Sequence, residues 1–224
     1  MKKWSVKEYP FVPTITNALP ETTALIVSGE GVLDLAGGVQ RVSSLSGDGL
    51  ITNSASEVAE LIISGEAQGA FTGRISDNIK LIFENDGSID LGGSSISVSS
   101  IEGSGRIANG TVEVDEISPG GKGKTGTLVF ESAPASGATY VCDGFAEKTD
   151  KIVIEGDFDI STLAFRYERS NLNGFKFEIL SVGGVRTGDD FASVSGVNGA
   201  WYITHDVDNS SYLKYRGGTV ILFK

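Results

Sequence analysis

Two stretches of this chain repeat each other and decide its fold. Residues 31–53 read GVLDLAGGVQRVSSLSGDGLITN, and residues 87–109 read GSIDLGGSSISVSSIEGSGRIAN. They align without a gap, and 11 of the 23 aligned positions are identical. Self-similarity at this scale is typical of folds in which equivalent units stack on one another.

The pattern inside each copy predicts short strands. In the first copy Leu33 and Leu35 flank Asp34, and residues 89–91 repeat that alternation. A period of two places the apolar pair on one face of a strand and the aspartate on the other. Glycines then punctuate the strands, because a glycine turns a corner at little steric cost. The sequence therefore describes a coil of short strands with a corner after each strand.

Such coils bury apolar surface by stacking. One coil cannot cover its own apolar side, whereas parallel coils bury a continuous column and pair each strand with its equivalent. We expect about 20 to 25 residues per coil, with like side chains of successive windings directly over one another. Leu35 and Leu91 should then have equivalent surroundings. The alternative is a β-sandwich or β-meander with antiparallel pairing, because its strands recur at a similar spacing.

Composition divides the chain into three sections of one domain. Residues 1–23 form a lead-in segment, residues 24–125 hold the repeat coils, and residues 126–224 hold further coils and a cap. The last section contains 14 of the 19 aromatic residues. A solenoid must close its end, or its last coil exposes an apolar column and unpaired strand edges. We therefore expect aromatic side chains and antiparallel hairpins to form a lid on the same β-helix.

Charge and cysteine content limit the functions of the chain. The net charge of −11 repels phosphate backbones and anionic lipids, so nucleic acids and membrane surfaces are not expected partners. The single cysteine, Cys142, allows no internal disulfide and is expected to be a small buried apolar residue. No apolar run has the length of a membrane helix, and no signal-peptide core follows residues 1–3.

A series of short motifs follows in a fixed order along the chain. They are ISG at 63–65, GAFTGRIS at 69–76, GSIDLGG at 87–93, ISPGG at 117–121, GTLVF at 126–130, SGATYV at 136–141, DKIVIEG at 150–156 and TVIL at 219–222. The chain, over roughly residues 24–224, resembles the passenger region of bacterial autotransporter proteins, in particular the autotransporter-associated β-strand repeats. The resemblance implies a right-handed parallel β-helix that is exported to the cell surface for adhesion or as a spacer.

A glycine-rich segment is similar to a phosphate-binding loop. Residues 118–125 read SPGGKGKT, but the phosphate-binding pattern needs glycine where Ser118 stands, and a helix that follows the loop. Here the strand-like GTLVF at 126–130 follows instead. We expect a solvated turn.

Two groups of acidic residues invite a chemical interpretation. Asp189 and Asp190, together with His205 and Asp206, resemble the acid and base of polysaccharide hydrolases, but no substrate-holding Lys/Arg cluster accompanies them. We expect the acids in loops and His205 at a strand end. The second group forms Asp-x-Asp pairs, which place two carboxylates on one strand face, yet calcium needs six to eight oxygen ligands. Its members are Asp157, Asp159, Asp206 and Asp208.

The sequence therefore predicts an all-β, right-handed parallel β-helix (β-solenoid) with an aromatic-rich C-terminal capping section. We assign no catalytic, cofactor-binding or metal-binding residue. The expected function is that of a non-enzymatic, extracellular or cell-surface module, an adhesin or structural stalk that meets glycans or neighbouring cells. Two alternatives stay open: a β-helical carbohydrate-active enzyme, either a polysaccharide hydrolase or lyase, and a carbohydrate-binding module.

Overall fold

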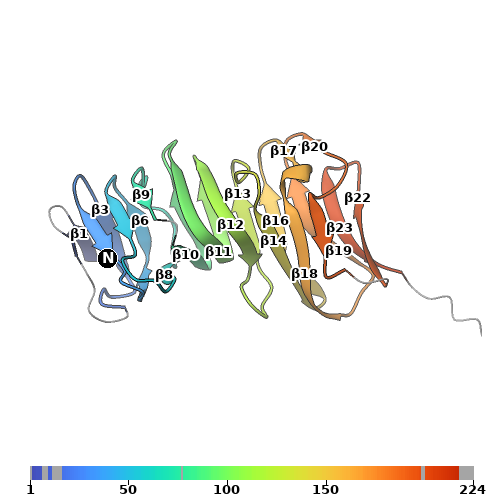
Figure 1. Ribbon diagram of the computed structural model, residues 1–224, viewed down its shortest axis with the longest axis horizontal. Coiled ribbons are helices and arrows are strands. Elements are labelled where there is room, and N and C mark those ends of the chain that lie inside the picture. Colours follow the sequence, from blue (N-terminus) through green and yellow to red (C-terminus); the bar gives the residue numbers. More distant parts are fainter. Residues whose placement is uncertain (1, 7–9, 12–16, 77, 198–199, 217–224) are drawn as a thin grey trace, which may run out of the picture.

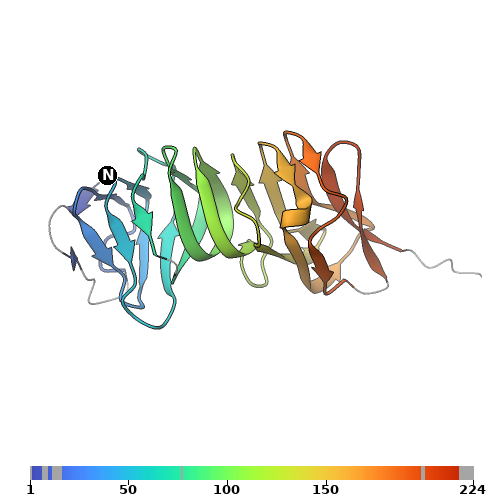
Figure 2. The same cartoon turned by 45° about the horizontal axis from the view of Figure 1, so that its top comes forward.

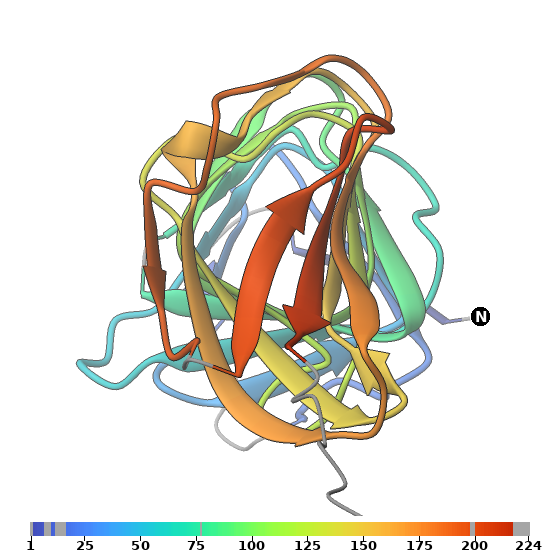
Figure 3. The same cartoon turned by 90° about the vertical axis from the view of Figure 1, so that its right-hand side faces the viewer.

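The computed structural model describes residues 2–6, 10–11, 17–76, 78–197 and 200–216 of the chain. These residues are nearly all β-structure and form a solenoid of about seven turns. The coil runs along one axis from β1 (Lys2–Val6) to β22 (Trp201–His205) (Figure 1, Figure 2). Seen from the C-terminal end, the chain winds counter-clockwise as it approaches the viewer, so the coil is right-handed (Figure 3). The predicted right-handed parallel β-helix is confirmed.

Each winding passes over three faces. Strands pair in parallel between neighbouring windings, in one unbroken ladder on face 3 and in separate ladders on faces 1 and 2. Face 1 contains β1, β3 (Thr23–Val27), β6 (Ser44–Ser46), residues 87–90 of β10 (Ile79–Asp90), residues 105–108 of β11 (Ser95–Ala108), β13 (Thr127–Phe130), β16 (Lys151–Ile154) and β19 (Lys176–Val182). Face 2 contains β2 (Pro10–Phe11), β4 (Val32–Asp34), β7 (Leu50–Thr52), β9 (Arg74–Ile75), residues 95–98 of β11, residues 111–114 of β12 (Thr111–Pro119), β17 (Phe158–Asp159) and β20 (Arg186–Thr187). Face 3 contains β5 (Val39–Val42), β8 (Ala59–Ile63), residues 79–83 of β10, 100–103 of β11 and 116–119 of β12, then β14 (Thr139–Ala146), β18 (Ala164–Leu172) and β21 (Ser193–Ser195).

Columns of like side chains fill the interior. On face 3, the fully buried residues in register are Leu61, Leu81, Ile101, Ile117 and Tyr140. On face 1, the equivalent buried column is Ile89, Ile107, Phe130, Ile154 and Val182. Residue 95 pairs with residue 111, and residue 164 pairs with residue 193, so one winding takes from 16 to 29 residues. The predicted stacking of like side chains is confirmed.

Equivalent residues of the two copies of the repeat lie on different faces of the coil. Leu33 lies on face 2, whereas its equivalent, Ile89, lies on face 1. Leu35 and Leu91 nevertheless occupy the same kind of corner. Each donates its N–H to the next winding and accepts an N–H from the residue three positions later. The repeated sequence thus forms a corner. Because the corners of a winding have similar conformations, the same sequence forms two different corners of the coil.

An aromatic lid closes the C-terminal end. β19 pairs in parallel with β16 but antiparallel with β23 (Ser210–Tyr215), which in turn pairs antiparallel with β22. These strands lie across the end of the coil (Figure 3). Beneath them the ring centroid of Trp201 lies 6.5, 6.0 and 5.1 Å from those of Tyr167, Phe177 and Tyr215. The predicted capping section is confirmed, whereas residues 219–222 lie outside the described part of the chain.

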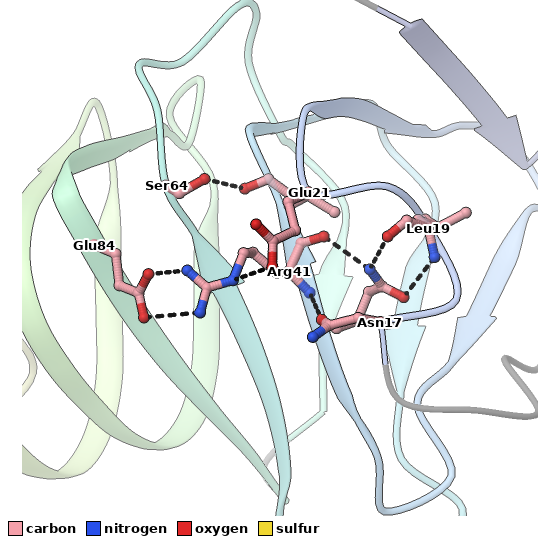
Figure 4. A network of polar contacts seen from close by, with 8 residues as sticks. Asn17, Leu19, Glu21, Arg41, Ser64 and Glu84 are labelled. Atoms are coloured by element: carbon pink, nitrogen blue, oxygen red, sulfur yellow. Dashed lines mark hydrogen bonds and ion pairs between the residues drawn. The ribbon is translucent and has the colours of Figure 1, made fainter.

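A second cap covers the opposite end of face 3. β5 pairs with β8 on one side only among the described strands, and residues 17–21 run along its other edge. The buried Gln40 amide accepts the N–H of Leu19 at 3.3 Å and donates to its carbonyl oxygen at 3.4 Å. Asn17 Oδ1 accepts the N–H of Arg41 at 2.8 Å (Figure 4). These contacts satisfy backbone groups that an open edge strand would leave unpaired.

Candidate functional site

The structure brings together two of the residues that the sequence singled out for acid–base chemistry. His205 Nε2, on β22, lies 3.1 Å from Asp190 Oδ1, in the loop after β20. Its Nδ1 lies 2.8 Å from the Oγ of Ser211, on β23. Serine, histidine and aspartate are thus joined in line, which is the arrangement used in nucleophilic catalysis.

The exposure of these three side chains is the reverse of what a hydrolase needs. Ser211 is completely buried, whereas 64% of the Asp190 side chain is exposed. A catalytic serine must reach its substrate, and its aspartate is normally the buried member. The ring of His205 packs against Phe191, with centroids 5.8 Å apart. The chain of hydrogen bonds therefore ties the Asp190 loop to the lid.

The other predicted acids point elsewhere. Asp189 is exposed, and Asp206 lies 2.9 Å from Lys176 Nζ and 3.7 Å from Lys214 Nζ. The hydrogen bond from Lys176 lowers the pKa of Asp206. The remaining Asp-x-Asp members, Asp157, Asp159 and Asp208, each accept a backbone N–H from a nearby residue. In the described ranges no cluster of three or more His, Cys, Asp or Glu side chains is arranged to hold a metal ion.

The glycine-rich loop binds the protein's own carboxyl groups. Gly123 donates its N–H to Asp143 Oδ2 at 2.8 Å, and Gly126 donates to Asp150 Oδ1 at 2.9 Å. β13 follows directly, so no helix N-terminus faces the loop. The N–H groups that would hold a phosphate in a nucleotide-binding loop are thus already engaged.

Asp143 and Asp150 form a buried carboxyl pair that the sequence reasoning missed. They lie at the base of the hairpin of β14 and β15 (Lys148–Thr149), and are 4% and 0% exposed. Asp150 Oδ2 accepts the N–H of Asp143 at 2.8 Å. Burial raises the pKa of Asp150 to about 8, although N–H donors oppose the shift. Nothing in the sequence signals this burial, because it depends on contacts with a segment more than 15 residues away, the loop that supplies Gly123 and Gly126.

Two further polar side chains complete the cluster. Tyr140 Oη lies 2.8 Å from the carbonyl oxygen of Asp150 and 3.0 Å from that of Ile179. Cys142 is completely buried, as its apolar surroundings predicted. Burial, and next the charge of Asp150, raise the pKa of its thiol. The thiol therefore stays protonated and unreactive.

Two adjoining grooves cross the outer surface of face 2. Their volumes are about 540 and 350 Å³, and both are lined by Ser97 and Glu113, so they form one continuous groove. We call this the face-2 groove; its polar lining is Arg74, Ser76, Ser95, Ser97, Glu113, Asp115 and Ser136. A separate hollow of about 500 Å³, the hairpin pocket, lies between β14–β15 and face 1; Thr127, Lys148, Lys151 and Glu178 are among its lining residues.

Charged side chains outside the face-2 groove pair between windings. Arg106 bonds to Glu155 and lies 3.7 Å from Glu131, while Arg41 bonds to Glu84 (Figure 4). By contrast, no ion pair forms at the three charged residues of the groove within the part of the chain that the structure describes.

No family model, curated protein or solved structure matches the chain. Function must therefore be argued from this geometry. No described helix is long and apolar enough to cross a membrane.

Proposed function

We propose that the chain is a non-enzymatic module of an exported surface protein, a β-solenoid that serves as an adhesin or a structural stalk, like autotransporter passenger regions. Its action is mechanical and multivalent. A stiff column presents polar outer faces to glycans or to neighbouring cells. The observation that carries the proposal is the unbroken apolar column along face 3, from Leu61 to Tyr140, which residues 17–21 cover at one end.

The physical basis is the stacking of windings. The windings are hydrogen-bonded to their neighbours by parallel ladders, one of which is unbroken along face 3, and paired strands lie about 4.8 Å apart. Bending the column would break ladder hydrogen bonds and open the close-packed core. The same spacing repeats the outer side chains at regular intervals, which favours many weak contacts with an extended partner.

The face-2 groove is the surface that fits such a partner best. Ser95 and Ser97 present hydroxyl groups that donate and accept hydrogen bonds. Glu113 and Asp115 are exposed carboxylates that repel anionic polymers and accept hydrogen bonds from sugar hydroxyls. We therefore propose neutral or basic glycans as the class of ligand.

A binding experiment tests the proposal. The whole chain is applied to a glycan array and to bacterial and host cells, beside the variants Ser97→Trp, which fills the groove, and Ser56→Trp, which changes an exposed corner. We expect binding by the parent and by Ser56→Trp, and its loss in Ser97→Trp. Equal binding by both variants would exclude the groove, and failure of the parent to bind would remove the adhesin role.

The carbohydrate-active enzyme, hydrolase or lyase, remains the second candidate because Asp190 and His205 lie 3.1 Å apart. A panel of acidic and neutral polysaccharides is incubated with the parent, Asp190→Asn and Asp189→Asn. The proposed surface module turns over none of them. Turnover that Asp190→Asn or Asp189→Asn abolishes would establish the enzyme instead.

A further inference from the structure

The parallel ladder of face 2 is broken at two places. Among the described strands β9 pairs with β7 alone, so the ladder of β2, β4, β7 and β9 ends there. Residues 95–98 of β11 and 111–114 of β12 form a second ladder of two strands. A third ladder, of β17 and β20, follows further along the axis. The first break therefore lies between β9 and β11, and the second lies beyond β12.

The two halves of the face-2 groove coincide with these two breaks. The half of about 350 Å³ lies between β9 and β11 and is lined by residues 74–76 and 95–97. The half of about 540 Å³ lies between β12 and residues 135–137, which are not a strand. At one end of this second break Ala135 donates its N–H to the carbonyl oxygen of Val112 at 2.8 Å. The groove thus follows interruptions in the sheet.

The groove reaches the backbone at both breaks. Ile75, Ile96 and Val114 are among its lining residues. Their side chains belong to the core, however, and these residues are only 5%, 2% and 8% exposed. The groups that they can present to the groove are therefore those of the main chain.

The direction of the ladder bonds identifies which backbone groups face the first break. Successive residues of a strand turn their N–H and C=O groups to opposite sides. Ser76 donates its N–H back to Ile51, so the N–H and C=O of Ile75 point forward across the break. On β11 the carbonyl oxygen of residue 94 accepts an N–H from the following winding. By the same alternation, Ser95 and Ser97 turn their backbone groups back across the break, where no ladder forms.

The chemistry of the groove fits a polyhydroxylated ligand. Backbone groups without a ladder partner bond to water or to a ligand, and a hydroxyl group can both donate to the C=O and accept from the N–H. Ser95, Ser97 and Ser136 add hydroxyl groups of their own. None of the exposed large apolar side chains of the described residues lines the groove. It therefore lacks the apolar anchors that a protein partner would bury.

The dimensions of the breaks favour a ligand that lies along the axis. A strand inserted between β9 and β11 would hold them about 10 Å apart, whereas residues of the two strands lie within 8 Å of each other. The two breaks are separated by the paired strands β11 and β12, so their centres also lie about 10 Å apart. This separation is comparable with the length of two sugar units in an extended chain.

We propose that the two breaks are the two subsites of a groove for a linear, extended polysaccharide, which lies along the axis and places every second sugar unit over a break. The inference rests on the proposed function and names the form of the glycan: the inner units of an unbranched chain. Hydroxyl groups of the bound units take the place of the missing ladder partners. In a basic glycan an amino group can pair with Glu113, which lines both halves of the groove.

Oligosaccharides of increasing length test the proposal. The whole chain is titrated by calorimetry with β-1,4-linked glucose oligomers, which are neutral, and with glucosamine oligomers, which are basic, from one to six units. We expect the affinity for at least one series to rise about tenfold or more between two and four units, because only the longer chain reaches both breaks. From four to six units it should change little.

The length series and the glycan array separate two kinds of failure. An affinity that is equal at every length would overturn the two-subsite inference and leave the adhesin role intact. Failure of both series to bind would overturn the inference as well. Binding to glycans on the array then decides separately whether the adhesin role survives.

Two matched substitutions block one break each. Ser95 lines the first half of the groove and Ser136 the second, and both residues are exposed. Ser95→Trp and Ser136→Trp should each lower the affinity for the six-unit oligomer about tenfold, to that of the two-unit oligomer. Ser56→Trp, at an exposed corner, is the control and should bind as the parent does. Parent-like affinity in either groove variant would refute the two-subsite arrangement.

Hydrogen exchange of the parent keeps the proposal testable if a variant fails to fold. The amides of Ile75, Ser95 and Ser97 should exchange fast in the free chain, although the rest of β11 is protected. Arg74 and Ser76, whose N–H groups bond to the preceding winding, should exchange slowly. The six-unit oligomer should slow the first three amides at least about tenfold and leave the other two unchanged. Protection of the first three in the free chain, or no slowing in the complex, would sink the idea.

Discussion

At the scale of single residues, the corners depend on glycines that no other residue can replace. Gly47 and Gly103 occupy equivalent positions in the repeat, with φ of 108° and 95°. A Cβ atom would lie 2.0 Å from the carbonyl oxygen of Val27 in the first case and 1.9 Å from that of Phe83 in the second. Gly93 also has a positive φ, 88°, but has open space around it. The repeat thus keeps glycine at positions where two windings approach each other closely, as well as at positions where the backbone has a positive φ.

This difference gives a matched pair of substitutions. Gly93→Ala adds only backbone strain and should lower the free energy of unfolding by about 1 kcal/mol. Gly103→Ala adds a clash with the backbone of the preceding winding at Phe83, so the loss should exceed about 3 kcal/mol. Urea denaturation followed by circular dichroism measures both. Equal losses would show that strain alone, and not the approach of the windings, sets the need for glycine.

The buried carboxyl of Asp150 makes stability depend on pH. Its pKa is about 8 in the folded chain and about 3.9 in the unfolded chain, so between these values only the folded chain keeps the proton. The contribution of Asp150 to stability is therefore complete below about pH 4. It falls as pH rises, by at most about 1.4 kcal/mol per pH unit, and is lost above pH 8.

Denaturation of the parent and of Asp150→Asn at pH 5, 7 and 9 measures this dependence. The free energy of unfolding of the parent, minus that of the variant, should decrease at each step. A difference that is constant across the three pH values would mean that Asp150 titrates normally.

At the scale of elements, the two ends are covered in different ways. The C-terminal lid is a set of antiparallel strands, which reverses the ladder and seats aromatic rings on the open core. The other end of face 3 is covered by the segment 17–21, whose backbone is held by Gln40 from inside the column. Both devices prevent a coil of another chain from adding to the apolar column.

A substitution at Trp201 tests how much the lid contributes to the free energy of unfolding. It is 8% exposed and packs against three aromatic rings. Trp201→Ala should lower the free energy of unfolding by about 3 to 5 kcal/mol, as for other large buried side chains. Phe175→Ala is the control, since Phe175 is 71% exposed, and it should cost less than about 1 kcal/mol. A small loss at Trp201, measured by urea denaturation, would mean that the lid is not needed to close the core.

At the scale of the whole molecule, strands pair mainly with the windings on either side. The parallel pairs join residues 16 to 29 positions apart in the chain, such as Ser95 with Thr111 and Ala164 with Ser193. Stability in such a column is a sum of nearest-neighbour terms, so a winding with two neighbours is held better than one near an end. The protection of backbone amides against hydrogen exchange should therefore vary along the axis of the coil.

Hydrogen exchange of the native chain measures this gradient. We expect the slowest exchange in β10 and β11, which lie in the middle and pair on both sides. Faster exchange should occur in β1 and β3, near the end that lacks the aromatic lid. Uniform protection from β1 to β23 would show that the column unfolds as a single cooperative unit.

Much of the fold and little of the site could be predicted from the sequence. The alternation around Asp34 and the glycine corners act within one winding, so they determined the strands, the stacked columns and, with the aromatic residues, the lid. Asp190 and His205 were singled out as acid and base, but the burial of Ser211 beside them was not visible. The carboxyl pair was missed because its members lie on either side of an ordinary polar hairpin.

The sequence by itself thus determined a coil of strands with an aliphatic interior, because periodicity and corner residues are local properties. Only the tertiary structure decided which side chains of neighbouring windings contact one another. In the folded chain the second copy of the repeat lies one face away from the first. Ser211 is buried and Asp190 is exposed, which is the opposite of a catalytic serine and aspartate. Asp143 and Asp150 are buried together. The physical reason is that each winding takes its own number of residues, from 16 to 29. The register between windings therefore cannot be read from any one of them.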